Sequence, residues 1–199
     1  MKYFALTLFL GLIVLPSFAQ IHKVDLKDKN FVYFGLDFSA AKMIGSEDFP
    51  DGFELVNSQL EEWNQLILDE PKKFDFKKTF KIFSFDHDLD GVRKHNKAIN
   101  HREFVTDLSY RFNELKVEEV VKDLDLSNSP SVNGVGFIFI VESYNKKEAK
   151  GTFWCTFFDL KTKEVLGTQK LDGESGGTGI TSHWSNSVYD CMKKIEKIM

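Results

Sequence analysis

Cysteine is scarce in this sequence, since Cys155 and Cys191 are the only two among 199 residues. Two cysteines this far apart do not make a zinc site unless histidines are placed near them. Two alternatives stay open for the pair. A disulfide between them would tie a predicted strand to the last predicted helix. Such a bond can persist if the chain is exported. Otherwise both residues are small buried thiols.

Long runs of basic residues are also lacking along the sequence. Removing Lys2 from the 26 basic residues leaves 25 against 30 acidic ones, which is a net charge of −5. No basic cluster longer than two residues is interleaved with aromatic residues. Because phosphate binding needs a concentrated positive surface, nucleic acid is not expected as a partner.

After the first nineteen residues, no apolar run is long enough for a membrane span. Met1–Ala19 itself has a basic start at Lys2, an apolar core, and small residues two apart at its end, Ser17 and Ala19. This pattern is typical of a secretory signal peptide that is cut before Gln20. The alternative, an uncleaved membrane anchor, is not favoured because the apolar run is short and has no basic flank on its far side.

Removal of the leader would leave one exported domain. Residues 20–199 are numerous enough for a single core, and they contain no internal repeat, low-complexity tract or second composition regime. The residue directly after the cleavage point is Gln20 and not a cysteine, which argues against a bacterial lipid anchor. We therefore expect a periplasmic or secreted protein that has no stable membrane span.

Twenty phenylalanines indicate either a large aromatic core or an exposed aromatic binding face, and the core is favoured. The stretch that organises the chain begins with Val135–Val141, which is apolar apart from Gly136. Such a segment is typical of a strand that is covered on both faces. Short polar breaks separate it from Gly151–Leu160 and from Val165–Gly173. We therefore predict three strands paired as antiparallel hairpins.

The remaining elements give the fold class. Two further strands, Phe31–Ala41 and Phe80–Asp86, are predicted to lie side by side, followed by a less regular region at His87–Arg102. Apolar stripes at helical spacing predict three helices, at Phe53–Glu70, at Glu103–Leu124, and after Ser182 as an N-cap. The order β-α-β-α-β-β-β-α predicts an α+β domain, with a single mixed β-sheet of about five strands and helices packed on it.

The sequence DHDLDG at Asp86–Gly91 resembles the start of a calcium loop, in which alternate oxygens and a glycine surround a hard cation. Counting from Asp86, the twelfth position is Lys97, where a bidentate Glu is required. Three histidines lie nearby at spacings of eight and six, which suit no recognised ligand pair: His87, His95 and His101. We expect no metal and no cofactor. A periplasmic small-ligand or metal-binding protein that uses Asp86–His101 is kept as an alternative.

The sequence GESGG at Gly173–Gly177 resembles the nucleophile segment of chymotrypsin-like proteases. Such an enzyme also needs a histidine base and a buried aspartate, and no histidine here sits in the small-residue context of that family. Ser175 has the G-x-S-x-G spacing of a nucleophile elbow, but the predicted helix starts about five residues later. The same glycine run precedes a helix, as a phosphate-binding loop does. It lacks the G-K-[ST] ending that such a loop needs. A hydrolase is therefore the least favoured alternative, and no catalytic residue is predicted.

The C-terminal third resembles an uncharacterised family of exported proteins from Gram-negative bacteria. The features that recur there are a Ser-Tyr strand end, an F-D-x-x-T turn, a glycine-rich loop and a Trp-containing helix. Here they fall at Ser143–Tyr144, Phe158–Thr162, Gly173–Gly179 and Trp184. The element order is also similar to the periplasmic α+β domain shared by the curli-secretion lipoprotein and the amino-terminal part of TolB. This chain lacks the lipid-bearing cysteine of the first and the β-propeller of the second, and the resemblance implies no catalytic residues.

These observations favour a non-enzymatic exported envelope protein that acts through protein–protein contacts. An export signal is present, whereas no convincing set of acid, base and nucleophile accompanies it. The contact surface is expected to be an exposed edge strand or an interaction loop. That loop would consist of Ser175, Gly176, Gly177, Gly179 and Trp184.

Overall fold

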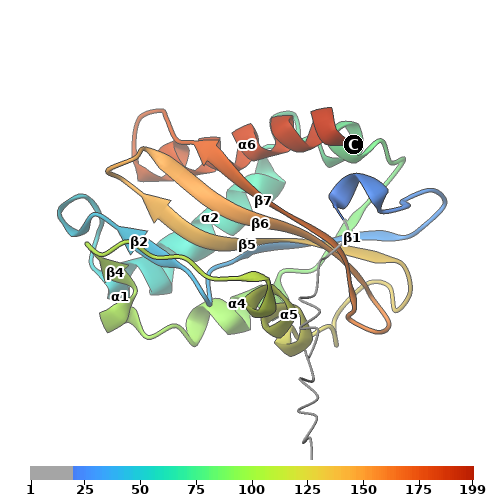
Figure 1. The fold of residues 1–199 in the computed structure, drawn as a ribbon, viewed down its shortest axis with the longest axis horizontal. Helices are drawn as coiled ribbons and strands as arrows, with labels where there is room; N and C mark the ends of the chain where they lie inside the picture. Colours follow the sequence, from blue (N-terminus) through green and yellow to red (C-terminus); the bar gives the residue numbers. More distant parts are fainter. Residues whose placement is uncertain (1–19) are drawn as a thin grey trace, which may run out of the picture.

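Strand β5 (Val135–Asn145) lies at the centre of the sheet and is paired along both of its edges. The computed structural model describes residues 20–199, so the predicted signal peptide, Met1–Ala19, lies outside the described residues. On one side β6 pairs with β5 in the antiparallel direction. On the other side β1 and β2 follow one another along β5, and both run parallel to it (Figure 1).

The outer positions of the sheet are taken by β7 beside β6, by β3 beside β1, and by β4 beside β2. In chain order the strands are β1 (Phe31–Asp37), β2 (Lys42–Ile44), β3 (Asp86–His87), β4 (Val105–Thr106), β5, β6 (Lys150–Asp159) and β7 (Val165–Glu174). The sheet is therefore mixed. It is antiparallel from β5 to β7 and parallel from β5 towards β3 and β4.

Helices cover both faces of this sheet. They are α1 (Gly52–Glu54), the π-helical turn η3 (Leu55–Gln59), α2 (Leu60–Asp69), α3 (Phe76–Phe80), α4 (Asp90–Lys97), α5 (Glu114–Asp123) and α6 (Ile180–Ile198). Short 3-10 turns are η1 (Ile21–Lys23), η2 (Ser46–Asp48) and η4 (His101–Glu103). α6 lies over one face of the sheet, and α4 and α5 lie over the other (Figure 1). None of the helices between residues 20 and 199 has the length and apolar content that a membrane crossing requires.

The predicted α+β class is confirmed, because one mixed sheet carries helices packed on it. The three C-terminal strands are also where the sequence placed them, with continuous antiparallel registers from β5 to β7. Residues 52–69 are helical as expected, with the π-helical turn in the middle. Phe53 is the exception in that stripe, since its side chain is 62% exposed and packs edge-on against His101 instead of entering the core.

The predicted strand at Phe80–Asp86 is wrong for most of its length. Phe80 ends helix α3, and only Asp86 and His87 form a strand, β3, which does lie beside β1 as expected. The helix forms because Asp75 accepts a hydrogen bond from the amide of Lys78 at its start. Phe76 and Phe80, four residues apart, both enter the core. The run of alternating apolar residues was too short to reveal that period.

The region between β3 and β5 was also predicted wrongly. The less regular stretch at His87–Arg102 contains helix α4, and the long helix expected at Glu103–Leu124 is reduced to α5. Phe104 is buried but Leu108 is 76% exposed, so the expected stripe does not face one surface. The last helix begins at Ile180 with Gly179 as its N-cap, so the predicted cap, Ser182, lies in its first turn.

Most phenylalanines between residues 20 and 199 belong to the core, as expected, and they pack on both faces of the sheet. On the α6 face Phe137 is the centre of a cluster with Phe80 and Phe157, at ring-centroid distances of 4.7 and 4.8 Å. Further along β5, Tyr144 stacks on Trp184 of α6 at 4.4 Å and meets Trp63 of α2 edge-on at 5.3 Å. Aromatic pairs at such distances contribute stabilisation beyond their buried area. They fix α2 and α6 to the sheet.

The contact between β7 and α6 depends on Gly173. A Cβ atom at this position would lie 1.9 Å from the carbonyl oxygen of Ser187 in α6. We therefore expect Gly173→Ala to push α6 away from β7 and to lower the free energy of unfolding by about 1–3 kcal/mol. The measurement is the urea-unfolding midpoint. The matched control is Gly176→Ala, where a Cβ meets nothing within 4 Å, and equal midpoints for the two variants would contradict this packing.

Candidate functional site

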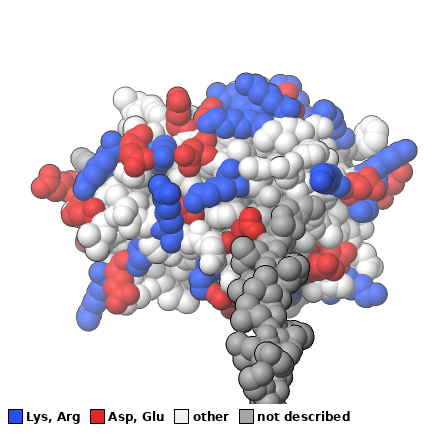
Figure 2. Space-filling view, in the orientation of Figure 1, with Lys and Arg blue, Asp and Glu red and all other residues white. Residues whose placement is uncertain are grey.

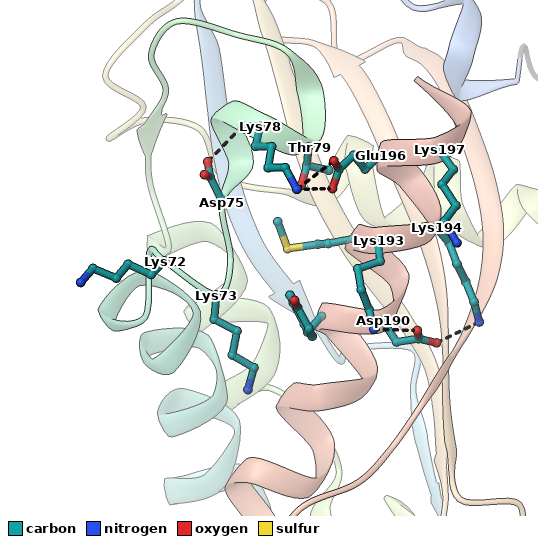
Figure 3. A pocket seen from close by; sticks show the side chains of 12 residues that line it. Lys72, Lys73, Asp75, Lys78, Thr79, Asp190, Lys193, Lys194, Glu196 and Lys197 are labelled. Atoms are coloured by element: carbon teal, nitrogen blue, oxygen red, sulfur yellow. Dashed lines mark hydrogen bonds and ion pairs between the residues drawn. The ribbon is translucent and has the colours of Figure 1, made fainter.

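A lysine-rich hollow lies between the segment that follows α2 and the last turns of α6. Its volume is about 500 Å³. Its lysines are Lys72, Lys73, Lys78, Lys193, Lys194 and Lys197 (Figure 3). We call this hollow the lysine groove. Three carboxylates also line it, so its local net charge is +3, whereas residues 20–199 as a whole have a net charge of −5.

The burial of aromatic residues explains why the first set of lysines points outward. Helix α2 ends just before Pro71, because a residue that precedes proline is disfavoured in the helical region. The chain then returns to the core at Phe74 and Phe76, which are both buried. Lys72, Lys73 and the lysines of α3 are left on the solvent side of this turn.

The amphipathic pattern of α6 presents the second set of lysines. Trp184, Val188, Cys191 and Ile195 are buried on the sheet side of the helix. Lys193, Lys194 and Lys197 occupy the opposite stripe, as helical periodicity requires. Because α3 packs against α6, the two sets of lysines contribute to the lining of the same hollow. Lys72 points outward on one side of it, and Lys194 and Lys197 extend on the far side of α6 (Figure 3).

Ion pairs hold some of these lysines in place. Lys78 pairs with Glu196 at 3.0 Å, and Asp190 pairs with Lys194 at 3.0 Å and with Lys193 at 3.5 Å. Exposed pairs of this kind contribute little to stability, so these ammonium groups can turn towards a ligand at little expense. Within the described part of the chain, Lys72 and Lys197 form no ion pair. Lys193 also lies over the ring of Tyr189, with 4.8 Å from its Nζ to the centroid.

Sequence reasoning missed this groove because its two halves are far apart in the chain. Lys78 and Glu196, which form a hydrogen bond across it, are 118 residues apart. The signal present in the sequence was a set of Lys-Lys pairs, at 72–73, 77–78 and 193–194. Each pair alone is typical of a solvated surface, and only the packing of α3 on α6 brings them together.

A second polar cluster lies at the end of β1. The carboxylate of Asp37 is fully buried and is 2.6 Å from Nδ1 of His95 on α4. Its other oxygen accepts hydrogen bonds from the amide and the hydroxyl of Ser39, at 2.8 and 2.5 Å. A hollow of about 360 Å³ opens beside Ser39 and His95. The three residue types are those of a serine–histidine–aspartate relay.

The hydrogen bonds do not connect these residues as a relay requires. A nucleophilic serine must bond to the imidazole that removes its proton, whereas Ser39 donates to the carboxylate. Neighbouring asparagines have a structural role too, because Asn64 and Asn96 bond to the backbone of Leu36 where β1 bulges. We therefore assign the Asp37–His95 pair to holding α4 against the end of β1.

This pair predicts a pH dependence of stability. The hydrogen bond to Asp37 raises the pKa of His95 above its ordinary value of 6.5, and the nearby Asp123 acts in the same direction. A raised pKa in the folded state means that the stabilisation is complete below about pH 6.5 and is lost as the pH rises through the folded pKa. We expect this loss in the native protein and not in His95→Gln. The measurement is the free energy of unfolding by urea, taken for both proteins between pH 5.5 and 9. If the two proteins show the same dependence on pH, the assignment of this effect to His95 is wrong.

A buried carboxylate also occupies the bulge in β5. Glu142 lies between Val141 and Ser143, where the register with β6 shifts. Both of its oxygens bond to Nζ of Lys170, at 2.6 and 2.7 Å, and one accepts the indole N–H of Trp154 at 3.0 Å. A buried charge that is paired in this way is satisfied, so the arrangement by itself indicates a structural ion pair.

The predicted interaction loop is held down on the start of α6. The amide of Gly176 donates to the carbonyl of His183 at 3.1 Å, and Asn186 donates to the carbonyl of Gly176 at 2.6 Å. Gly177 and Gly179 have φ angles of +99° and +79°, which favour glycine. Both lie at the surface, so they are accessible to a partner.

Trp184, however, does not belong to the exposed loop. Its side chain is fully buried between Tyr144 and Phe49, and the latter ring lies 5.3 Å away. The expectation of a contact surface that includes this residue is therefore wrong. Helical spacing places Trp184 on the apolar stripe, and that stripe faces the sheet.

The hydrolase alternative receives no support from the geometry of this loop. The hydroxyl of Ser175 and Nε2 of His183 are both buried without a hydrogen-bond partner. A serine nucleophile requires a bond to its base, so these two residues do not form an activated pair.

The segment Asp86–His101 has structural contacts of its own. Asp88 accepts a hydrogen bond from the amide of Asp90, His95 bonds to Asp37, and His101 packs on Phe53. In residues 20–199 no three His, Cys, Asp or Glu side chains come together as metal ligands would. The alternative of a metal-binding protein therefore gains no ligand set here.

The two cysteines lie on packed elements, Cys155 on β6 and Cys191 on α6. Both are buried and both are free thiols in the structure. Burial raises the pKa of both thiols, so neither is a reactive thiolate at neutral pH. The sequence left open a disulfide or two buried thiols, and in the structure the two cysteines are buried free thiols.

No protein-family model, curated protein or solved structure matches this chain. The resemblance to exported Gram-negative proteins, and the similar element order of the curli and TolB domains, therefore stay predictions. Unlike the clusters around Asp37 and Glu142, the lysine groove has charged groups that lie at the surface and form only exposed ion pairs.

Proposed function

We propose that this chain is an exported, non-enzymatic protein of the cell envelope that acts by binding, and that the lysine groove holds an anionic partner. One observation carries the proposal. Two segments more than a hundred residues apart place six lysines around a single hollow, on a chain that is acidic as a whole. The three positive charges that the carboxylates of the hollow do not balance repel one another, which lowers stability unless an anion binds there.

The spacing of charges favours a ligand with several negative groups. The Debye length at physiological ionic strength is about 8 Å, so ammonium groups within one hollow act on a ligand together. A single small anion would satisfy only a few of them. A surface or chain of repeated anionic groups would engage both Lys72 and Lys197, which have no ion pair in the described part of the chain.

Binding agrees better with the remaining polar groups than catalysis does. The buried carboxylates of Asp37 and Glu142 are already satisfied by His95 and Lys170. Ser175 has no base. These contacts support a domain whose interior polar groups maintain its shape and whose surface makes contacts.

Contact with a protein partner, the mode of action expected from the sequence, is the second candidate. Strand β7 has ten residues and pairs only with β6 among the strands between residues 20 and 199. Its outer edge offers backbone donors and acceptors to an added strand, except near its end, where Asp190 and Lys194 of α6 bond to the backbone of Glu174 and Asp172. The glycines at 177 and 179 lie close after this strand and would form part of the same surface.

A polyanion column tests the first candidate. The charge-reversal variant Lys193→Glu/Lys194→Glu should elute from heparin at lower NaCl than the native chain. Exposed charge pairs contribute up to about 1 kcal/mol each, so the loss of two should weaken heparin binding by roughly tenfold. The measurement is the elution salt, together with the salt dependence of binding.

The matched control is Lys116→Glu/Lys122→Glu on α5, over the opposite face of the sheet (Figure 1). It changes the net charge equally and also removes one i,i+3 and one i,i+4 ion pair, as the groove variant does. Equal shifts for both variants would show that total charge decides retention. That result, or failure of the native chain to bind heparin, would overturn the assignment of the groove.

A further inference from the structure

A fully exposed phenylalanine lies close to the lysine groove. Phe83, in the loop between α3 and β3, is 99% exposed, more than the other large apolar side chains found at the surface of residues 20–199. Single exposed apolar residues are common and by themselves indicate nothing. Phe83 differs from such residues because lysines surround it.

Phe83 lines a second hollow of about 430 Å³, next to the C-terminus. Three lysines line the same hollow, Lys27, Lys29 and Lys81, with one carboxylate, Asp28. The loop after α3, the first described residues and the C-terminus meet at one end of the molecule (Figure 1). An aromatic side chain is thus surrounded by positive charge.

The second hollow and the lysine groove are parts of one surface. Helix α3 and the loop after it contribute Lys78 to the groove and Phe83 to the second hollow, and the end of α6 contributes Lys197 to one and Met199 to the other. We call the combined surface the basic face. Among its side chains are nine lysines and four carboxylates, an excess of five positive charges, whereas the side chains of residues 20–199 as a whole have a net charge of −5. Figure 2 shows basic side chains gathered over α6.

From this arrangement we infer that the basic face docks on an anionic phospholipid bilayer, with the ring of Phe83 inserted among the lipid headgroups. The inference rests on the proposed function and names the anionic partner of the same groove. Basic residues combined with an exposed aromatic are typical of proteins that lie on a membrane surface. The lysines supply long-range attraction, and Phe83 supplies apolar contact once the surfaces meet.

The choice of lysine over arginine favours a bilayer over an acidic protein. No arginine lines either hollow. Arginine offers a rigid fork that recognises a carboxylate at a defined position, and it is enriched in protein interfaces. Lysine is a mobile point charge on a flexible chain, which suits headgroups that have no fixed position.

The expected sizes of the two contributions can be separated. A lysine close to an anionic leaflet strengthens binding by roughly fivefold, and this contribution falls with added salt. Transfer of one phenylalanine side chain out of water strengthens binding by about tenfold, with little dependence on salt. Replacing Phe83 should therefore weaken binding without changing the salt dependence, whereas replacing lysines should change both.

Vesicle sedimentation tests the inference. The protein is purified from an exporting host, and mass spectrometry establishes its N-terminal residue. It is mixed with vesicles of equal parts phosphatidylglycerol and phosphatidylcholine, or of phosphatidylcholine alone. Binding should require phosphatidylglycerol and should decrease with NaCl. Phe83→Ala should reduce the partition coefficient about tenfold, and Lys27→Glu/Lys29→Glu/Lys81→Glu should reduce it further.

Leu108→Ala is the matched control, because Leu108 is 76% exposed and follows β4, at the other end of the molecule (Figure 1). It should leave vesicle binding unchanged, and circular dichroism should show all variants folded. If Phe83→Ala binds vesicles as the native chain does, or if Leu108→Ala weakens binding equally, the docking inference fails.

The heparin experiment separates this failure from that of the proposed function. If the native chain binds heparin through Lys193 and Lys194 but not the vesicles, the groove has another anionic partner, such as an acidic protein, and only the docking inference is overturned. If neither heparin nor the vesicles bind, both proposals are overturned. If vesicles bind and Phe83→Ala weakens this binding without changing heparin retention, both are supported.

Discussion

The stacking of Tyr144 on Trp184 anchors the start of α6 on its face of the sheet. The two rings lie 4.4 Å apart, and Trp63 meets the same tyrosine from α2. Large aromatic side chains bury 150–250 Å² each, roughly, so this cluster outweighs any surface contact nearby. Because it fixes α6 at its start, the lysines near the end of the helix, Lys193 and Lys197, are held beside α3. The groove thus depends on a cluster of apolar contacts that none of its own residues makes.

The fold separates two kinds of polar group. Inside, Asp37 and Glu142 are buried at irregular points of β1 and β5, and each is matched by a partner from another element. Such groups must be paired, since an unpaired charge in the interior is costly. Outside, the lysines of the basic face exceed the acids near them and depend on solvent or a ligand. A surface built in this way suits contacts with an anionic partner.

The sequence predicted those features that local patterns determine. The run of apolar residues from Val135 predicted β5 because a strand covered on both faces needs apolar residues at every position. The spacing of Trp184 and Val188 predicted α6, since four residues make about one helical turn. The mixed sheet was predicted from strands that alternate with helices early in the chain and follow one another directly later in the chain. Local patterns failed where elements were short, as at Phe76–Phe80, whose five residues are helical.

The sequence by itself determined the α+β class, the three C-terminal strands and an acidic chain with a cleavable-leader pattern. Only the tertiary structure decided that Trp184 is buried, that His95 faces Asp37, and that Lys-Lys pairs from two distant segments form one groove. The reason is physical. Periodicity acts between residues a few positions apart, whereas burial and charge density depend on which elements pack together. Long-range apolar contacts determine this packing, and the local spacing of residues does not predict it.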